Sequence, residues 1–166
     1  MEKNRGIIET NRHSIVVNTS VIISAAISAR GGSFKILKLI NEKKVTIYVS
    51  EEMFDEYISK ISSDVLSKYI PLNRGKIIIS IIKSNMQPIS PKLDFSQDLA
   101  ILKRVKDLSD IKFLNAVYAS KAKFLISLDK KHILSLRNPQ TKTFKLKEHG
   151  FFILTPEEFL ESLDLE

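Results

Sequence analysis

The sequence predicts an α/β fold, a three-layer α/β/α sandwich with a mostly parallel central sheet. Short apolar segments rich in β-branched residues alternate with longer segments of helical periodicity, which is the pattern of strands joined by helical crossovers. The first of them, Ile15-Val16-Val17, is apolar throughout, as expected of a strand buried on both faces of a parallel sheet. It leads into three small polar residues and then a second apolar segment, so a strand passes directly into a helix.

The remaining elements follow from the same two patterns. Strands are expected where β-branched or aromatic residues cluster in short runs, at 15–17, 45–49, 124–127 and 150–154, with a short one at 86–89. Helices are expected where apolar residues recur every three or four positions, at 19–30, 34–42, 50–61, 64–70, 73–84, 95–105, 111–121 and 156–163. Gly31-Gly32 would end the first helix, while Ser33 and Thr155 are placed as N-caps. The polar segment 138–143 is expected to be a loop.

Length and composition indicate one domain. The chain has 166 residues, of which 43% are hydrophobic, enough for a single core. Residues 1–12 are polar and predict a loose leader, so the domain is expected to span residues 13–166. The sequence has no cysteine, which excludes disulfides and thiolate metal sites and fits a reducing compartment. No apolar run approaches a membrane span and no signal segment is evident, so we expect a cytoplasmic protein with no membrane partner.

The formal net charge is +7, and the excess is concentrated towards the C-terminal part of the chain. Between residues 121 and 149 only two acids oppose the basic residues Lys121, Lys123, Lys130, Lys131, Arg137, Lys142, Lys145 and Lys147. A basic surface suits a polyanion, for which nucleic acid is the usual candidate. Lysines that only keep a protein soluble produce the same pattern, so charge alone leaves both interpretations open.

Polar side chains gather where the predicted sheet ends. Asn18 follows the first strand and Asp129 follows the strand at 124–127, and the carboxyl ends of parallel strands share one edge. Glu56 and Asp110 lie near helix beginnings, which meet the same edge. Neighbouring carboxylates repel, and one takes up a proton unless a cation is present. A hard divalent cation, Mg²⁺ or Mn²⁺, resolves this conflict, and such a site suits phosphoryl chemistry.

Other readings of these residues compete with a metal site. Asn18 or Ser20 is a good helix N-cap, which needs no function. Neither a P-loop nor a Ser–His–Asp arrangement is evident. The histidines at positions 13, 132 and 149 show no ligand spacing and are expected at the surface or in supporting roles.

Five segments between residues 14 and 163 carry a further pattern. They are 15–25 (IVVNTSVIISA), 50–57 (SEEMFDEY), 107–114 (DLSDIKFL), 124–130 (FLISLDK) and 150–160 (GFFILTPEEFL). In sequence and in order they resemble the motifs of the PIN domain, the metal-dependent ribonuclease fold of VapC-type toxins. No single segment is decisive, but the five together span nearly the whole chain.

The resemblance implies a PIN-like fold and a Mg²⁺- or Mn²⁺-dependent endoribonuclease, the toxin of a toxin–antitoxin pair. It places Glu56, Asp110 and Asp129 at the metal, with Asn18 at the fourth ligand position. Supporting roles would fall to Thr19, Ser20, Ser127 and Asp107. The candidates for RNA phosphate contacts are Lys121, Lys130, Lys131 and Arg137. The family also implies a homodimer and a cognate antitoxin protein as partner.

Asn18 departs from the family pattern, in which the first acid is aspartate and an asparagine stands where this chain has Ser20. An amide offers one neutral oxygen and a donor NH₂, so we expect weaker metal binding than with aspartate. Asn18 is either natural, in an attenuated or inactive member, or a catalytic aspartate replaced to silence a toxic nuclease. A non-catalytic module that binds RNA or protein, or an RNA-processing nuclease outside any toxin system, is the alternative function.

Overall fold

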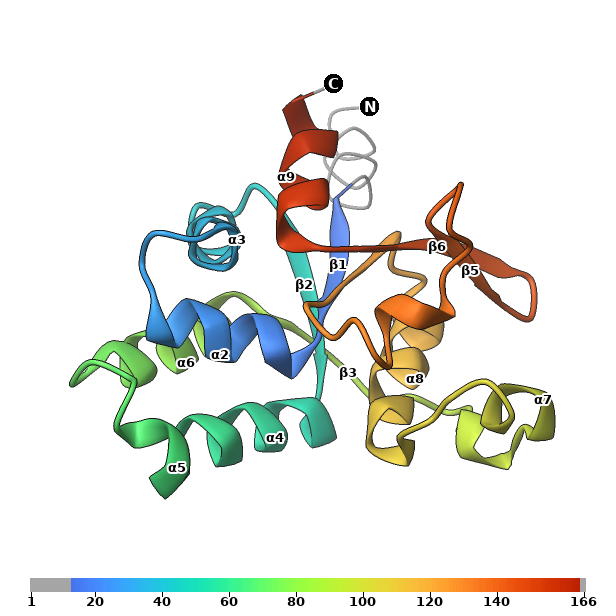
Figure 1. Ribbon diagram of the computed structural model, residues 1–166, viewed down its shortest axis with the longest axis horizontal. Coiled ribbons are helices and arrows are strands. Elements are labelled where there is room, and N and C mark those ends of the chain that lie inside the picture. Colours follow the sequence, from blue (N-terminus) through green and yellow to red (C-terminus); the bar gives the residue numbers. More distant parts are fainter. Residues whose placement is uncertain (1–12, 165–166) are drawn as a thin grey trace.

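The central sheet has six strands in the order β3-β2-β1-β4-β6-β5 within residues 13–164, the part of the chain that the computed structural model describes (Figure 1). The strands are β1 (Ser14–Val17), β2 (Thr46–Ser50), β3 (Gln87–Ile89), β4 (Phe124–Ile126), β5 (Thr143–Leu146) and β6 (His149–Leu154). Neighbouring strands are parallel except β5 and β6, which are antiparallel. The leader expected at residues 1–12 lies outside the described residues, as do residues 165–166.

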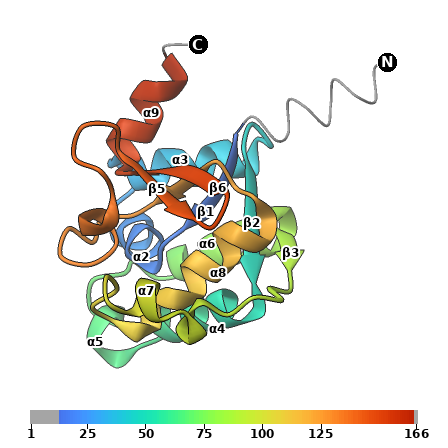
Figure 2. The same cartoon turned by 90° about the vertical axis from the view of Figure 1, so that its right-hand side faces the viewer.

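Helices cover both faces of this sheet, which confirms the predicted three-layer α/β/α sandwich. They are α2 (Thr19–Ile27), α3 (Gly32–Asn41), α4 (Glu51–Ile61), α5 (Asp64–Ser67), α6 (Arg74–Asn85), α7 (Leu99–Leu102), α8 (Ile111–Ser120) and α9 (Pro156–Asp164). Figure 2 shows α8 in front of one face, with α7 beside it. On the other face lie α2, α3 and α6, and α4 runs beneath α2 (Figure 1).

The strand order reverses between β1 and β4. From β1 the chain proceeds to β2 and β3 on one side, whereas β4, β6 and β5 lie on the other. Parallel pairing sets Val17 of β1 beside Ile126 of β4, so the two strands end at the same level. In open α/β sheets, ligands bind outside the carboxyl ends of the strands at such a switch point. The topology therefore singles out the residues that follow β1 and β4.

The hydrophobic core fills the space on both sides of β1. Ile15, Val16 and Val17 are fully buried, as expected of a strand covered on both faces. Leu114 of α8 and Ile36 of α3 are also fully buried. Among the described residues no single helix is long and apolar enough to cross a membrane, although α2 and α3 taken together, bent by 100°, reach that length and composition.

Helix caps account for several element boundaries. Thr155 and Glu158 form a capping box at the start of α9, because Thr155 Oγ1 accepts from Glu158 N (3.2 Å) and Glu158 Oε1 accepts from Thr155 N (2.9 Å). This confirms the cap predicted at Thr155. The cap predicted at Ser33 is wrong, because α3 begins at Gly32 with Gly31 as its N-cap, and Ser33 is buried inside the first turn.

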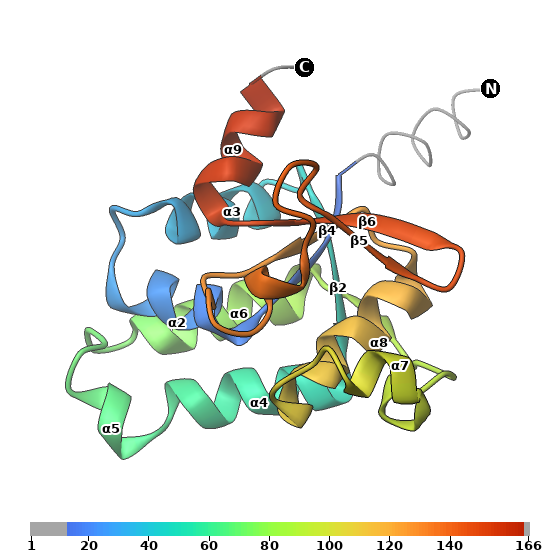
Figure 3. The same cartoon turned by 45° about the vertical axis from the view of Figure 1, so that its right-hand side comes forward.

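Two further predictions need correction. The single helix expected at 95–105 is instead a 3₁₀ turn, Phe95–Gln97, followed by the short helix α7. The Asp94 side chain accepts from Ser96 N, and the Asp98 side chain accepts from Ala100 N and Ile101 N, so each aspartate begins a separate turn. The loop expected at 138–143 leads into β5, which forms a hairpin with β6 (Figure 3).

Candidate metal centre

Asn18 sits at the junction of β1 and α2, and it is only 5% exposed. Its backbone N–H donates to the Ile126 carbonyl (2.9 Å), which extends the pairing of β1 with β4 by one residue. Its side-chain Oδ1 accepts from Ser20 Oγ (2.6 Å), Ser127 Oγ (3.1 Å) and Ser20 N (3.3 Å). The contact with Ser20 N makes Asn18 the N-cap of α2.

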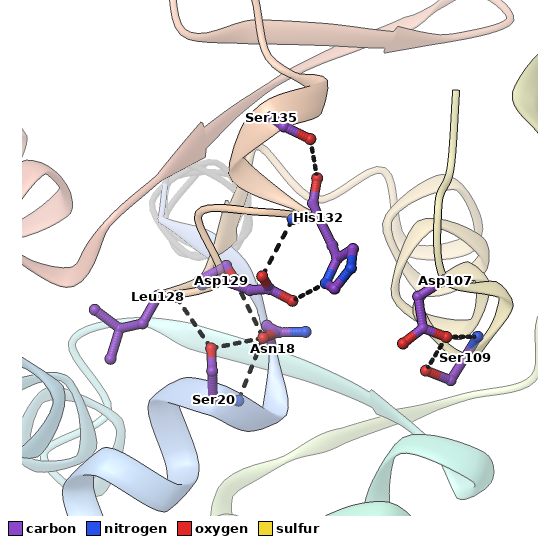
Figure 4. A network of polar contacts seen from close by, with 9 residues as sticks. Asn18, Ser20, Asp107, Ser109, Leu128, Asp129, His132 and Ser135 are labelled. Atoms are coloured by element: carbon purple, nitrogen blue, oxygen red, sulfur yellow. Dashed lines mark hydrogen bonds and ion pairs between the residues drawn. The ribbon is translucent and has the colours of Figure 1, made fainter. Parts of the chain in front are cut away.

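These contacts determine which way the Asn18 amide points. A backbone N–H can only donate, so the atom that faces Ser20 N must be the amide oxygen. Figure 4 shows the amide nitrogen on the other side of the group, directed away from Ser20. The part of Asn18 that remains for the site is therefore a hydrogen-bond donor, whereas a cation needs an acceptor.

Asp129 follows β4 and is oriented by its own loop. Its backbone N–H donates to Ser127 Oγ (3.0 Å), and Leu128 N donates to Ser20 Oγ (3.0 Å), which joins the loop to the start of α2. Both carboxylate oxygens meet His132: Oδ1 accepts from His132 N (3.1 Å), and Oδ2 lies 3.0 Å from His132 Nδ1 (Figure 4). Asp129 and His132 thus form one unit beside Asn18.

Asp110 is the buried carboxylate of the site. It ends the 3₁₀ turn Leu108–Asp110, is 7% exposed, and its Oδ2 is buried without a hydrogen-bond partner. Burial raises the pKa of Asp110 to about 6, and the negative charges of Asp107 and Asp129 add to this effect. A buried oxygen without a donor is costly, and it is the group that a bound cation would satisfy.

Asp107 and His132 complete the cluster. Ligand atoms of Asp107, Asp110 and His132 all lie within 4.8 Å of one another. Asp107 Oδ1 accepts from Ser109 N (2.9 Å) and Ser109 Oγ (2.8 Å), and these bonds lower the pKa of Asp107. Carboxylate and imidazole ligands fit a divalent cation, and the orphaned Asp110 oxygen is in the right place to receive one.

Glu56 is held by Thr19, which follows Asn18 in the chain, and by Lys112, which lies two residues after Asp110. Glu56 Oε1 pairs with Lys112 Nζ at 2.9 Å, and its Oε2 accepts from the Thr19 hydroxyl. Lys112 also donates to the Ser109 carbonyl, and its side chain is only 9% exposed. Glu56 therefore carries a positive counter-charge from the protein itself.

The predicted RNA-contact residues have different surroundings. Lys121 pairs with Glu148 (3.1 Å) and lies over the Tyr118 ring. Arg137 pairs with Glu158 (2.7 Å) and donates to the Ile153 carbonyl (2.9 Å). Lys130 and Lys131 are exposed and follow Asp129 directly in the chain, which keeps them beside the cluster.

His132 and Lys112 are parts of this region for which the sequence suggested no role at the metal. His132 was expected at the surface or in support, and its spacing of three residues from Asp129 was the available signal. Lys112 contacts Glu56 across 56 residues of sequence, a contact that no local pattern encodes.

A sequence profile of the PIN domain matches residues 14–131. The chain belongs to the PIN domain family. The protein MJ1680 of Methanocaldococcus jannaschii is 34% identical over 152 residues, which cover 90% of this chain and 91% of that protein. A further match is a chain in the crystal structure of VapBC2 from Rickettsia felis bound to a promoter DNA fragment. The two chains are 17% identical with a TM-score of 0.48, and the match covers 71% of this chain and 89% of that chain. PIN nucleases generally use divalent metals, and this PIN domain has an acidic cluster in which Asp107, Asp110 and His132 lie close together.

Proposed function

We propose that this PIN domain is a divalent-cation-dependent endoribonuclease attenuated by Asn18, and the toxin of a toxin–antitoxin pair. The observation that carries the proposal is Asp110, a buried carboxylate with one unpartnered oxygen, set among Asp107, Asp129 and His132. These residues lie at the switch point of the sheet, where such folds bind ligands. A cation at this position would relieve the mutual repulsion of the carboxylates.

The residues around the proposed cation site have different roles in this proposal. Asp110 is the central ligand, with Asp129, Glu56 and Asn18 as the other family positions around it. When bound, Mg²⁺ or Mn²⁺ supplies charge stabilisation for a phosphate and lowers the pKa of a water. Ser20 and Ser127 hold the Asn18 oxygen, and Thr19 and Lys112 hold Glu56. Exposed Lys130 and Lys131 are the phosphate contacts nearest to the cluster.

Restoring the family aspartate should restore activity. Asn18→Asp keeps an acceptor for Ser20 and Ser127 and adds a negative charge, so we expect cleavage of single-stranded RNA with Mn²⁺ to rise about 10–100-fold. Adding Asp110→Ala should abolish cleavage. Initial rates on a generic single-stranded RNA, and calorimetric Mn²⁺ affinities, measure both effects.

Asn138→Asp is the matched control, because it adds the same charge at an exposed position whose Oδ1 accepts from Gln140 N and Thr141 N. It should leave the rate unchanged. Equal Mn²⁺ affinity of the unmodified and Asn18→Asp proteins would contradict the attenuation.

A non-catalytic binding module is the second candidate, favoured by Asn18, whose side-chain oxygen accepts three hydrogen bonds. If the unmodified protein, Asn18→Asp and Asn18→Asp/Asp110→Ala all fail to cleave RNA but still bind it, this module is the better description. A nuclease that processes RNA outside a toxin system would cleave but lack an antitoxin. A small neighbouring gene whose product co-purifies with this protein on co-expression would favour the toxin, and its absence would favour the processing nuclease.

We also propose that the domain forms a homodimer through the segment from α5 to the start of α6. Four large apolar side chains are exposed there: Val65 (74%), Tyr69 (64%), Leu72 (93%) and Ile77 (55%). Leu72→Glu should raise the dimer dissociation constant at least about tenfold, because a charge is costly in an apolar interface. Light scattering coupled to gel filtration measures this.

Leu99→Glu provides the control for this dimer, since Leu99 is 75% exposed on α7, which lies far from α5 in Figure 3. A Leu72→Glu protein that remains as dimeric as Leu99→Glu would rule out this surface.

A further inference from the structure

We infer that the cation site of this PIN domain is a mixed nitrogen–oxygen site formed by Asp107, Asp110 and His132, with Asp129 as the residue that positions His132. Such a site favours a divalent transition-metal ion over Mg²⁺. The inference rests on the proposed function only for the presence of a divalent cation. It changes the ligand set implied by the family pattern.

The spacing of the three residues fits one ion. Their ligand atoms lie within 4.8 Å of one another, so one point lies within about 2.8 Å of all three, and the bonds to such an ion are about 2.1 Å long. Side-chain adjustments of less than an ångström would bring them into the coordination sphere. Asp110 Oδ2, buried and without a partner, points independently to a ligand that is bound here.

The contact of His132 with Asp129 leaves Nε2 as the ring nitrogen that can bind a cation. His132 Nδ1 lies 3.0 Å from Asp129 Oδ2, so Nδ1 carries the proton in this contact. In the neutral imidazole, Nε2 then has a lone pair for a cation. In Figure 4 the ring lies between Asp129 and Asp107. A carboxylate that fixes the tautomer of an imidazole ligand is the usual support of a metal-bound histidine.

Both carboxylate oxygens of Asp129 contact His132. Its Oδ1 accepts from the His132 backbone N–H (3.1 Å) while its Oδ2 meets the ring, so both oxygens serve the same residue. Its contribution to the cation is therefore made through the orientation of His132.

Asp107 has an oxygen available for the ion. Among residues 13–164, the hydrogen bonds to its carboxylate, from Ser109 N (2.9 Å) and Ser109 Oγ (2.8 Å), both end on Oδ1. We therefore assign Asp107 Oδ2, Asp110 Oδ2 and His132 Nε2 as the atoms that would hold the ion. Asn18, by contrast, directs its NH₂ group away from Ser20 and supplies no acceptor.

The ligand set predicts the choice of metal. Mg²⁺ is bound through oxygen ligands, whereas imidazole suits Mn²⁺ and, more strongly along the Irving–Williams order, Co²⁺. The unmodified protein should therefore bind Co²⁺ more tightly than Mn²⁺, and Mn²⁺ more tightly than Mg²⁺. The visible absorption of bound Co²⁺ depends on its ligands and their geometry, so it reports the loss of a ligand without reference to activity.

The test is calorimetric titration of the full chain with Co²⁺, Mn²⁺ and Mg²⁺, with Co²⁺ absorption spectra recorded in parallel. His132→Gln should weaken Co²⁺ and Mn²⁺ binding about 10–100-fold, affect Mg²⁺ less, and shift the Co²⁺ spectrum. His149→Gln is the matched control. His149 lies on β6 and its ring bonds to the Ala122 carbonyl (2.8 Å), so removing this imidazole should change none of these affinities.

Asp129→Asn separates positioning from direct coordination. If Asp129 acts through His132, the Asp129→Asn/His132→Gln protein should bind Co²⁺ no more weakly than His132→Gln alone. If the losses of Co²⁺ affinity caused by Asp129→Asn and His132→Gln add up in the double variant, Asp129 is a direct ligand and this assignment is overturned. If Asp110→Asn abolishes binding while His132→Gln leaves affinities and spectrum unchanged, the mixed site is wrong but the proposed nuclease site stands. If the natural protein binds none of the three ions, both fail.

Discussion

Asparagine in place of Asp110 is expected to abolish divalent-cation binding and, in the metal-free protein, to raise the free energy of unfolding by about 1–3 kcal/mol above pH 6. The two effects have one cause. Asp110 is 7% exposed and its Oδ2 has no hydrogen-bond partner, so the ionised side chain is destabilising until a cation arrives. Asparagine keeps the shape and removes the charge.

The pH dependence follows from the raised pKa. Burial, with the charges of Asp107 and Asp129, raises the pKa of Asp110 from 3.8 to about 6 in the folded protein. Between these values the unfolded chain has lost this proton while the folded protein retains it. The free energy of unfolding of the metal-free protein therefore falls by up to about 3 kcal/mol as the pH rises from about 4 to about 6, and this contribution is constant above.

Urea unfolding in the presence of a chelator, at pH 5 and at pH 7.5, measures this prediction. Asp110→Asn should lack the loss of stability that the natural protein shows between these two values. Asp94→Asn is a suitable control, because hydrogen bonds from Ser96 and Asn115 lower the pKa of Asp94, so its removal should not stabilise. A metal-free Asp110→Asn protein no more stable than the natural one at pH 7.5 would refute the argument.

Lys112→Met is expected to lower the free energy of unfolding by about 2–3 kcal/mol, a value between those of exposed and buried ion pairs. The side chains of Lys112 and Glu56 are 9% and 21% exposed, with 2.9 Å between Nζ and Oε1. Removing the ammonium leaves Glu56 partly buried with the Thr19 hydroxyl as a remaining partner, and leaves the Ser109 carbonyl without this donor.

A double-mutant cycle of Lys112→Met with Glu56→Gln measures the pair itself. We expect a coupling free energy of about 1–2 kcal/mol, because each single variant leaves an uncompensated group that the double variant lacks. The Lys121–Glu148 pair, with side chains 49% and 69% exposed, is the surface control and should couple more weakly. Coupling no larger than that of the surface pair would mean that Lys112 does not stabilise Glu56.

Much of the fold could be predicted from local patterns. The runs of buried apolar residues at β1, β4 and β6 and the periodicity of α2, α4 and α8 are signals carried by neighbouring residues. The errors occur where the signal is short or ambiguous. In β5 only Phe144 and Leu146 alternate with polar residues, and pairing with β6 makes the strand. The segment 95–105 has apolar residues at helical spacing, but Asp94, just before it, and Asp98, within it, cap two separate turns.

Residue order alone placed Asn18 and Asp129 after strands of a parallel sheet, and the sheet topology brings those strand ends together. The hydrogen-bond partners of the individual groups come from contacts over long sequence distances: Ser127 reaches Asn18 across 109 residues and Lys112 reaches Glu56 across 56. Propensity and periodicity describe a segment's own backbone and buried face, and they carry no information about which side chain of a distant segment will lie opposite. Which partners the side-chain oxygens of Asn18 and Asp129 bond, which oxygen of Asp110 is left without a donor, and whether His132 joins the acids therefore depend on the packed structure.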